Sequence, residues 1–74
     1  MRTLAFPLRG EYVPLCDLLK LAGLADSGGQ GKALVASGAV RVDGLPETRK
    51  TAKIRIGQQV ECGGVRILVQ AEGT

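Results

Sequence analysis

The chain has 74 residues, 45% of them hydrophobic and 23% charged, with a formal net charge of +3 at pH 7. This length predicts a single domain over residues 1–74, and the mixed composition excludes a disordered chain. No apolar run is long enough to cross a membrane, and the first residues lack the apolar core of a secretory signal. We therefore expect a cytoplasmic protein with no membrane partner.

The two cysteines, Cys16 and Cys62, have no partner at CxxC spacing, and the sequence contains no histidine. A zinc site needs about four ligands at short spacings, so no metal site and no cofactor are expected. Two separated cysteines in a cytosolic chain are expected to be free thiols, packed like small apolar residues. Without a histidine or an evident carboxylate pair to act as a base, the sequence predicts no enzyme.

The first ten residues contain a candidate strand over Thr3–Phe6, which Pro7 and Gly10 should end. A helix follows, because four apolar residues recur at the spacing of one helical face: Leu15, Leu18, Leu19 and Ala22. Pro14 suits the first turn of this helix, and Gly23 is expected just beyond its end.

A second helix is predicted to begin at Ser27. Ser27 and Gln30 form a capping box, in which the hydroxyl accepts from a first-turn amide and the glutamine side chain reaches back. The inward face should carry Ala33, Leu34 and Ser37, and Gly38 should end the helix. The first turn contains three glycines, Gly28, Gly29 and Gly31, each costing about 1 kcal/mol relative to alanine in a helix interior. Either something approaches this backbone closely, or the turn frays.

The next segment has the alternation of a strand. Val40 and Val42 should point to one side of a sheet and Arg41 to the other. Asp43-Gly44 then gives a strong turn signal.

Two more strand regions are expected after this turn. Ile54 and Ile56 mark a possible short strand, and residues 58–61 and 65–69 are typical of a hairpin around residues 62–64. The order of strand, helix, helix and further strands predicts an α+β fold, with two short helices packed on a small, mostly antiparallel sheet.

Basic residues gather in the second half of the chain. Five lie between residues 41 and 55, opposed only by Asp43 and Glu47: Arg41, Arg49, Lys50, Lys53 and Arg55. If the second helix packs beside the strand of Arg41, Lys32 and the helix amino end join them. Free amides at a helix amino end bind phosphate, and the glycines would leave them accessible. The alternative is that these cations form only a solvated loop and the glycines a loose turn.

The run Gly-Gly-Gln-Gly-Lys at residues 28–32 does not form a nucleotide-binding phosphate loop. That pattern needs glycine at position 26 and serine or threonine at position 33, where the chain has Asp26 and Ala33. Nucleotide hydrolysis is therefore excluded.

Several of these residues follow the order of a known family. The leucine helix before Gly23, the Ser27-Gly28 cap with Lys32, and the strand ending in Val42-Asp43-Gly44 resemble the S-four-type RNA-binding domain, named after the fourth protein of the small ribosomal subunit. The likeness covers about residues 13–70, and residues 47–50 are similar to its stand-alone, YbcJ-like bacterial branch. It implies a non-catalytic module whose αL RNA-binding motif, two helices and a loop, binds RNA.

The predicted partner is structured RNA, and ribosomal or transfer RNA are candidates. Phe6 and Tyr12 are expected at the core or its edge, so recognition should rest on phosphate and shape rather than base stacking. Asp43 and Gly44 should shape the turn, and Asp43 is a candidate for contact with a ribose hydroxyl. The predicted RNA-binding residues are Ser27, Gly28, Lys32, Arg41, Asp43, Gly44, Arg49, Lys50 and Lys53.

One other function stays open on the sequence. The chain could instead be a protein-interaction module or a ribosome-associated accessory factor, using the apolar residues of the last hairpin or the first helix. In either case we expect a monomer, with any protein partner bound in trans.

Overall fold

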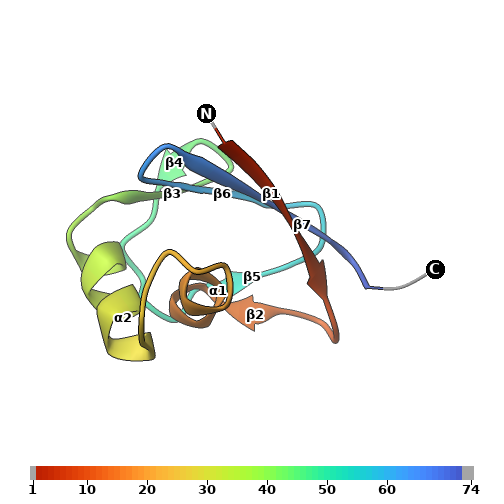
Figure 1. Cartoon of the computed structure of the whole chain (residues 1–74), viewed down its shortest axis with the longest axis horizontal. Helices are drawn as coiled ribbons and strands as arrows, with labels where there is room; N and C mark the ends of the chain where they lie inside the picture. Colours follow the sequence, from red (N-terminus) through yellow and green to blue (C-terminus); the bar gives the residue numbers. More distant parts are fainter. Residues whose placement is uncertain (1, 73–74) are drawn as a thin grey trace.

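A computed structural model of the chain describes residues 2–72 as two short helices packed against a mostly antiparallel sheet (Figure 1). A five-stranded sheet has the order β1-β7-β6-β3-β4, and a separate two-stranded ribbon pairs β2 with β5. The helices are α1 (Leu15–Leu21) and α2 (Gly28–Ala36). The strands are β1 (Arg2–Leu8), β2 (Val13–Pro14), β3 (Val40–Val42), β4 (Leu45–Pro46), β5 (Lys53–Ile54), β6 (Gln59–Cys62) and β7 (Val65–Ala71). The predicted α+β fold is confirmed.

The first strand is longer than the sequence predicts. β1 runs parallel to β7 and continues through Pro7 to Leu8. Proline lacks an N–H for the hydrogen-bonded ladder, and β1 tolerates this because it is an edge strand, paired only with β7. The remaining neighbours in the large sheet are antiparallel.

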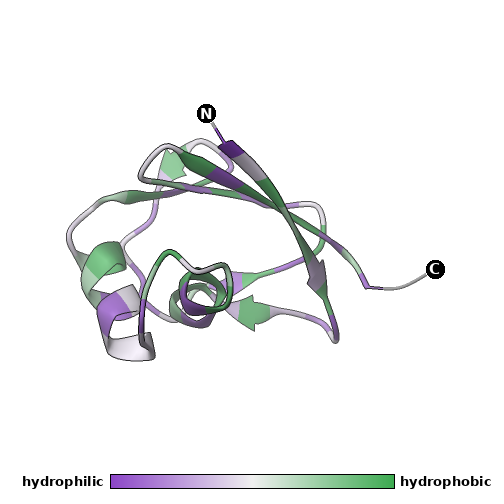
Figure 2. Ribbon diagram, in the orientation of Figure 1, coloured by the Kyte–Doolittle hydropathy of each residue, from purple (hydrophilic) through white to green (hydrophobic). Residues whose placement is uncertain are grey.

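The core lies between the helices and one face of the large sheet. The strands carry both hydrophobic and hydrophilic residues (Figure 2), and along β3 and β6 the two kinds alternate, as expected for a sheet covered on one side. The largest fully buried side chains are Leu15, Leu18, Leu19, Val35, Val40, Ile54, Val60 and Ile67. Val40 of β3 and Val60 of β6 point into this core. Their chain neighbours Arg41 and Glu61, which pair across the two strands, therefore project from the opposite face.

The first helix and its end agree with the sequence prediction. Leu15, Leu18 and Leu19 are buried, and Gly23 follows the helix with φ of 82°, a left-handed conformation that suits glycine. Within residues 2–72, neither helix is long and apolar enough to span a bilayer. The thiols of Cys16 and Cys62 are free and buried, as expected.

The predicted inward face of α2 is right only at Leu34, which packs against the core. Ala33 and Ser37 are exposed, whereas Gly31 and Val35, one turn apart, are buried. A Cβ atom at Gly31 would lie only 2.6 Å from the carbonyl oxygen of Cys16 in α1. The helices therefore meet through this glycine, which is the close approach that the glycine-rich turn suggested.

The predicted cap at Ser27 is confirmed with one difference. The Ser27 hydroxyl accepts a hydrogen bond from the Gln30 amide at 3.1 Å. The Gln30 side chain reaches back one residue further than expected and accepts from the amide of Asp26. The first turn of α2 is thus held in place despite its glycines.

Candidate nucleic-acid interface

An open hollow lies between α2 and the segment before β5. We call it the basic hollow; it is lined by Lys32, Thr48, Arg49, Lys50, Thr51, Ala52 and Lys53. Its volume is about 910 Å³. Because cations and hydroxyls dominate the lining, the hollow suits a polyanion better than the apolar ligands that fill most small-molecule pockets.

The position of this segment follows from the start of α1. Pro14 precedes α1 and provides no side-chain cap, so the first amides need other acceptors. The Leu15 amide donates to the Ala52 carbonyl at 2.9 Å, and the Cys16 amide donates to the Lys50 carbonyl at 3.1 Å. The backbone carbonyls that accept from the first amides of α1 therefore also fix the positions of Lys50 and Lys53.

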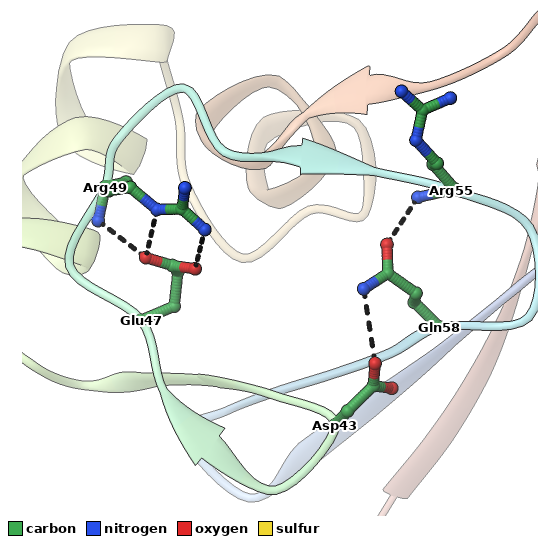
Figure 3. Close-up of polar contacts among 5 residues, drawn as sticks. All are labelled: Asp43, Glu47, Arg49, Arg55 and Gln58. Atoms are coloured by element: carbon green, nitrogen blue, oxygen red, sulfur yellow. Dashed lines mark hydrogen bonds and ion pairs between the residues drawn. The ribbon is translucent and has the colours of Figure 1, made fainter.

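Arg49 differs from the neighbouring lysines because a carboxylate holds it. Glu47 accepts bonds from the Arg49 amide at 3.0 Å and from its guanidinium at 3.1 and 3.0 Å (Figure 3). These bonds favour the charged carboxylate, and they lower the pKa of Glu47 from 4.5 to about 2. The same contact raises the pKa of Arg49. Arg49 thus contributes less free positive charge than its position suggests.

The structure brings four of the predicted site residues together in the basic hollow: Lys32, Arg49, Lys50 and Lys53. Ser27 and Gly28 lie at the amino end of α2, outside the hollow lining. Gly28 is four residues before Lys32, which places both on the same side of the helix. A Cβ atom at Gly28 would meet no atom within 4 Å, so this end of α2 is open.

The prediction that Arg41 joins the other cations is wrong. Its neighbours Val40 and Val42 face the core, so the alternation of β3 sends Arg41 to the uncovered face of the sheet. There it lies opposite Glu61 and beside a second hollow that the other cations do not line. The strand alternation predicted that Arg41 points away from Val40 and Val42, but the sequence did not reveal that the other cations line a different hollow, beside α2.

Asp43 and Gly44 form the tight turn between β3 and β4, as predicted. Their φ angles are 52° and 83°, the left-handed conformation that such a two-residue hairpin turn needs. The Asp43 carboxylate accepts from the Gln58 side chain at 3.2 Å (Figure 3). It also accepts from the Gln59 amide at 3.0 Å. Both residues lie outside the basic hollow, and Asp43 holds the turn before β6 against the hairpin.

Sequence reasoning missed a cluster at Tyr12. The exposed fraction of Tyr12 is 41%, whereas Phe6 packs against the core as expected. The Lys53 ammonium lies 5.1 Å from the centre of the Tyr12 ring, and the Arg55 guanidinium lies 5.8 Å from it. The pairing of β2 with β5 produces this cluster, and two-residue strands leave no sequence signal for such a pairing.

The comparison with known families agrees with this geometry. The family model described as the S4 domain matches residues 6–70. The chain belongs to the S4 domain family. The resemblance predicted from the leucine helix, the serine cap and the Val-Asp-Gly strand end is therefore confirmed.

Individual S4 domain relatives lie in the expected branch. The chain is 52% identical over 60 residues to "Putative RNA-binding protein YbcJ" of Escherichia coli, covering 81% of this chain and 86% of that protein. The same values relate it to "Uncharacterized protein YbcJ" of Shigella flexneri.

Solved structures share the fold of this S4 domain. The solution structure of YbcJ from E. coli, described as having an αL motif involved in RNA binding, matches with a TM-score of 0.68 and 46% identity. That match covers 96% of this chain and 89% of YbcJ. The ribosomal protein S4e of Thermoplasma acidophilum matches 78% of this chain and 31% of its own, with a TM-score of 0.59 and 24% identity, which shows the shared fold alone.

Proposed function

We propose that this S4 domain is a non-catalytic module that binds structured RNA, with the basic hollow as its main contact for backbone phosphates. The observation that carries the proposal is the convergence of Lys32 from α2 with Lys50, which lies before β5, and Lys53, the first residue of β5. The RNA-binding descriptions of the YbcJ relatives support it. Ribosomal and transfer RNA are the candidate partners, bound by a monomer.

The charge state of the hollow favours a polyanion. Among residues 2–72 the ion pairs are Arg9–Glu72 and Arg49–Glu47, so Lys32, Lys50 and Lys53 have no carboxylate partner there. Lysine ammonium groups bind phosphate as point charges and carry no base information. The hollow would therefore position the domain on the RNA backbone without reading its sequence.

The amino end of α2 would extend this surface. Its helix dipole and the amides of Gly28 and Gly29 favour an anion, and Lys32 lies one turn further along the same side. The Ser27 hydroxyl accepts from Gln30 but keeps its own hydrogen for a phosphate oxygen. Asp26 sits beside this end, so we expect a weaker phosphate contact here than at the lysines.

The test compares two double variants of equal net charge. Lys32→Gln/Lys50→Gln removes two cations from the hollow, whereas Arg2→Gln/Arg41→Gln removes two that lie elsewhere, on β1 and on the uncovered sheet face. Affinity for a hairpin RNA is measured over a series of salt concentrations. The lysine variant should reduce the slope of log K against log salt by about 1.4–1.8, at about 0.7–0.9 for each phosphate that is no longer neutralised. The arginine control should keep the wild-type slope.

Two results would overturn the proposal. If the arginine control reduced the slope as much as the lysine variant, binding would depend on total charge and not on the hollow. If the wild-type protein showed no salt-dependent affinity for any folded RNA, the RNA-binding function itself would be wrong.

A further inference from the structure

Tyr12 is an exposed aromatic ring held in a fixed place. It directly precedes β2, where buried Val13 pairs with buried Ile54 of β5. Lys53 of β5 and Arg55, the residue after β5, flank Ile54, and both cations lie over the Tyr12 ring. The Arg55 side chain extends toward β2 (Figure 3). The two short strands thus hold one exposed aromatic ring against two cations.

This cluster is continuous with the basic hollow, because Lys53 belongs to both. An RNA strand whose phosphates contact Lys50 and Lys53 would pass beside Tyr12. Neither Lys53 nor Arg55 has a carboxylate partner among residues 2–72, so both are free to turn toward a phosphate. A nucleotide strand suits the cluster, because the two cations at the ring can bind its phosphates.

We propose that Tyr12 is a stacking site for one unpaired RNA base, with Lys53 and Arg55 binding the phosphates on either side of that nucleotide. The inference deepens the proposed function, on which it rests: the preferred RNA has a bulge, loop or single-stranded end next to a folded region. Duplex RNA keeps its bases stacked inside the helix, so only an extruded or terminal base can reach the ring.

The relative strengths of the contacts favour replacement of a cation by an RNA base on the Tyr12 ring. A cation over an exposed ring changes the equilibrium constant for the contact by only about twofold to fivefold. A base stacked on an aromatic side chain contributes about fivefold to more than a hundredfold in affinity. A base can therefore displace one cation from the ring, and the displaced cation gains a phosphate partner.

The amino-acid composition provides a direct measurement. Tyr12 is the one tyrosine of the chain, and there is no tryptophan, so intrinsic protein fluorescence reports on this ring alone. Two hairpin RNAs are compared, both with the loop nucleotides replaced by a short ethylene-glycol linker: one has a single unpaired adenosine beside its stem, and the other lacks that nucleotide. We expect the first probe to quench the Tyr12 emission and the second to leave it nearly unchanged.

Binding by two variants completes the test. Tyr12→Ser should weaken binding of the adenosine-containing hairpin about 5- to 100-fold and leave the matched hairpin within about twofold. Tyr12→Phe keeps an aromatic face and should stay within about threefold of wild type on both RNAs. Circular dichroism and thermal unfolding of each variant establish that the β2–β5 ribbon still folds.

Each outcome separates the stacking site from the proposed function. If Tyr12→Ser weakened both hairpins equally, or if the adenosine left the emission unchanged, the stacking inference would be wrong. The RNA-binding function would still stand in that case, provided that Lys32→Gln/Lys50→Gln reduced the salt dependence on either hairpin. If the wild-type protein bound neither hairpin, both proposals would fail.

Discussion

Gly31 sets the distance between the two helices. A methyl group there would lie 2.6 Å from the Cys16 carbonyl oxygen, which belongs to the backbone of α1 and cannot rotate away. Alanine is favoured over glycine in a helix interior by about 1 kcal/mol, but such an overlap typically costs about 1–3 kcal/mol. We expect Gly31→Ala to lower the free energy of unfolding by up to about 2 kcal/mol, measured by urea denaturation.

The same helix offers a matched control two residues earlier. A Cβ atom at Gly29 would find only the Ser27 hydroxyl oxygen, at an ordinary contact distance of 3.8 Å. Gly29→Ala should therefore be neutral or stabilise the fold by up to about 1 kcal/mol. Equal stabilisation by both alanines would show that α1 and α2 do not approach each other closely at Gly31.

Glu47 gives the stability of the loop a pH dependence of known sign. Its pKa in the folded protein is about 2, below the ordinary value of 4.5, mainly because the Arg49 side chain donates hydrogen bonds to the carboxylate. A lowered folded pKa means that the stabilisation is fully present above the unfolded pKa and disappears as the pH falls through the folded one. The relevant window is therefore about pH 4.5 down to about pH 2.

Glu47→Gln tests this assignment. The free energy of unfolding of wild type should exceed that of the variant by a constant amount near neutral pH. The difference should then shrink steadily on acidification below about pH 4.5, as urea denaturation at a series of pH values would show. A difference that stayed the same down to about pH 2 would mean that the ionisation of Glu47 does not contribute to stability.

At the scale of secondary structure, elements with local signals could be predicted and those defined by distant contacts could not. The leucine spacing located α1, and Asp43-Gly44 located the β3–β4 turn, because periodicity and turn chemistry act within a few residues. The buried face of α2 could be predicted only at Leu34, because Gly31 makes its close contact with α1 without a side chain. The β2–β5 pairing depends on residues far apart in the chain, and Tyr12 was therefore misplaced at the core edge.

Asp43 stabilises the β3–β4 hairpin in two ways that a substitution series separates. It adopts a φ of 52°, and its carboxylate accepts from Gln58 and Gln59. Asp43→Ala removes both acceptors and places a residue with little tolerance for the left-handed region in the turn, so we expect a loss of about 1–2 kcal/mol. Asparagine tolerates this conformation and keeps a carbonyl acceptor, so Asp43→Asn should lose less, measured by thermal or urea unfolding. Equal losses would show that neither the acceptor nor the left-handed preference matters.

At the scale of the whole molecule, the position of the charges matters more than their sum. A net charge of +3 is modest, and the sequence placed all the cations between residues 41 and 55 on one surface. The fold divides them: β3 sends Arg41 to the uncovered face, and Glu47 holds Arg49. Lys50 and Lys53 stay in the hollow because the backbone carbonyls of Lys50 and Ala52 cap α1 and fix this part of the chain. That capping could not be read from the sequence, since Pro14 merely indicated where the helix begins.

A charge relocation tests this directly, because it leaves the net charge at +3. Lys50→Gln removes a cation from the hollow, and Thr3→Lys adds one at an exposed position of β1. If the hollow binds the RNA, the combined variant should show a salt slope smaller by about 0.7–0.9 than wild type, with weaker affinity, although its total charge is unchanged. Thr3→Lys alone should keep the wild-type slope, measured by the same hairpin titrations. Recovery of full affinity by the relocated lysine would instead mean that the RNA responds to the field of the entire protein, since a charge on the far edge of the sheet cannot contact a phosphate held between α2 and β5.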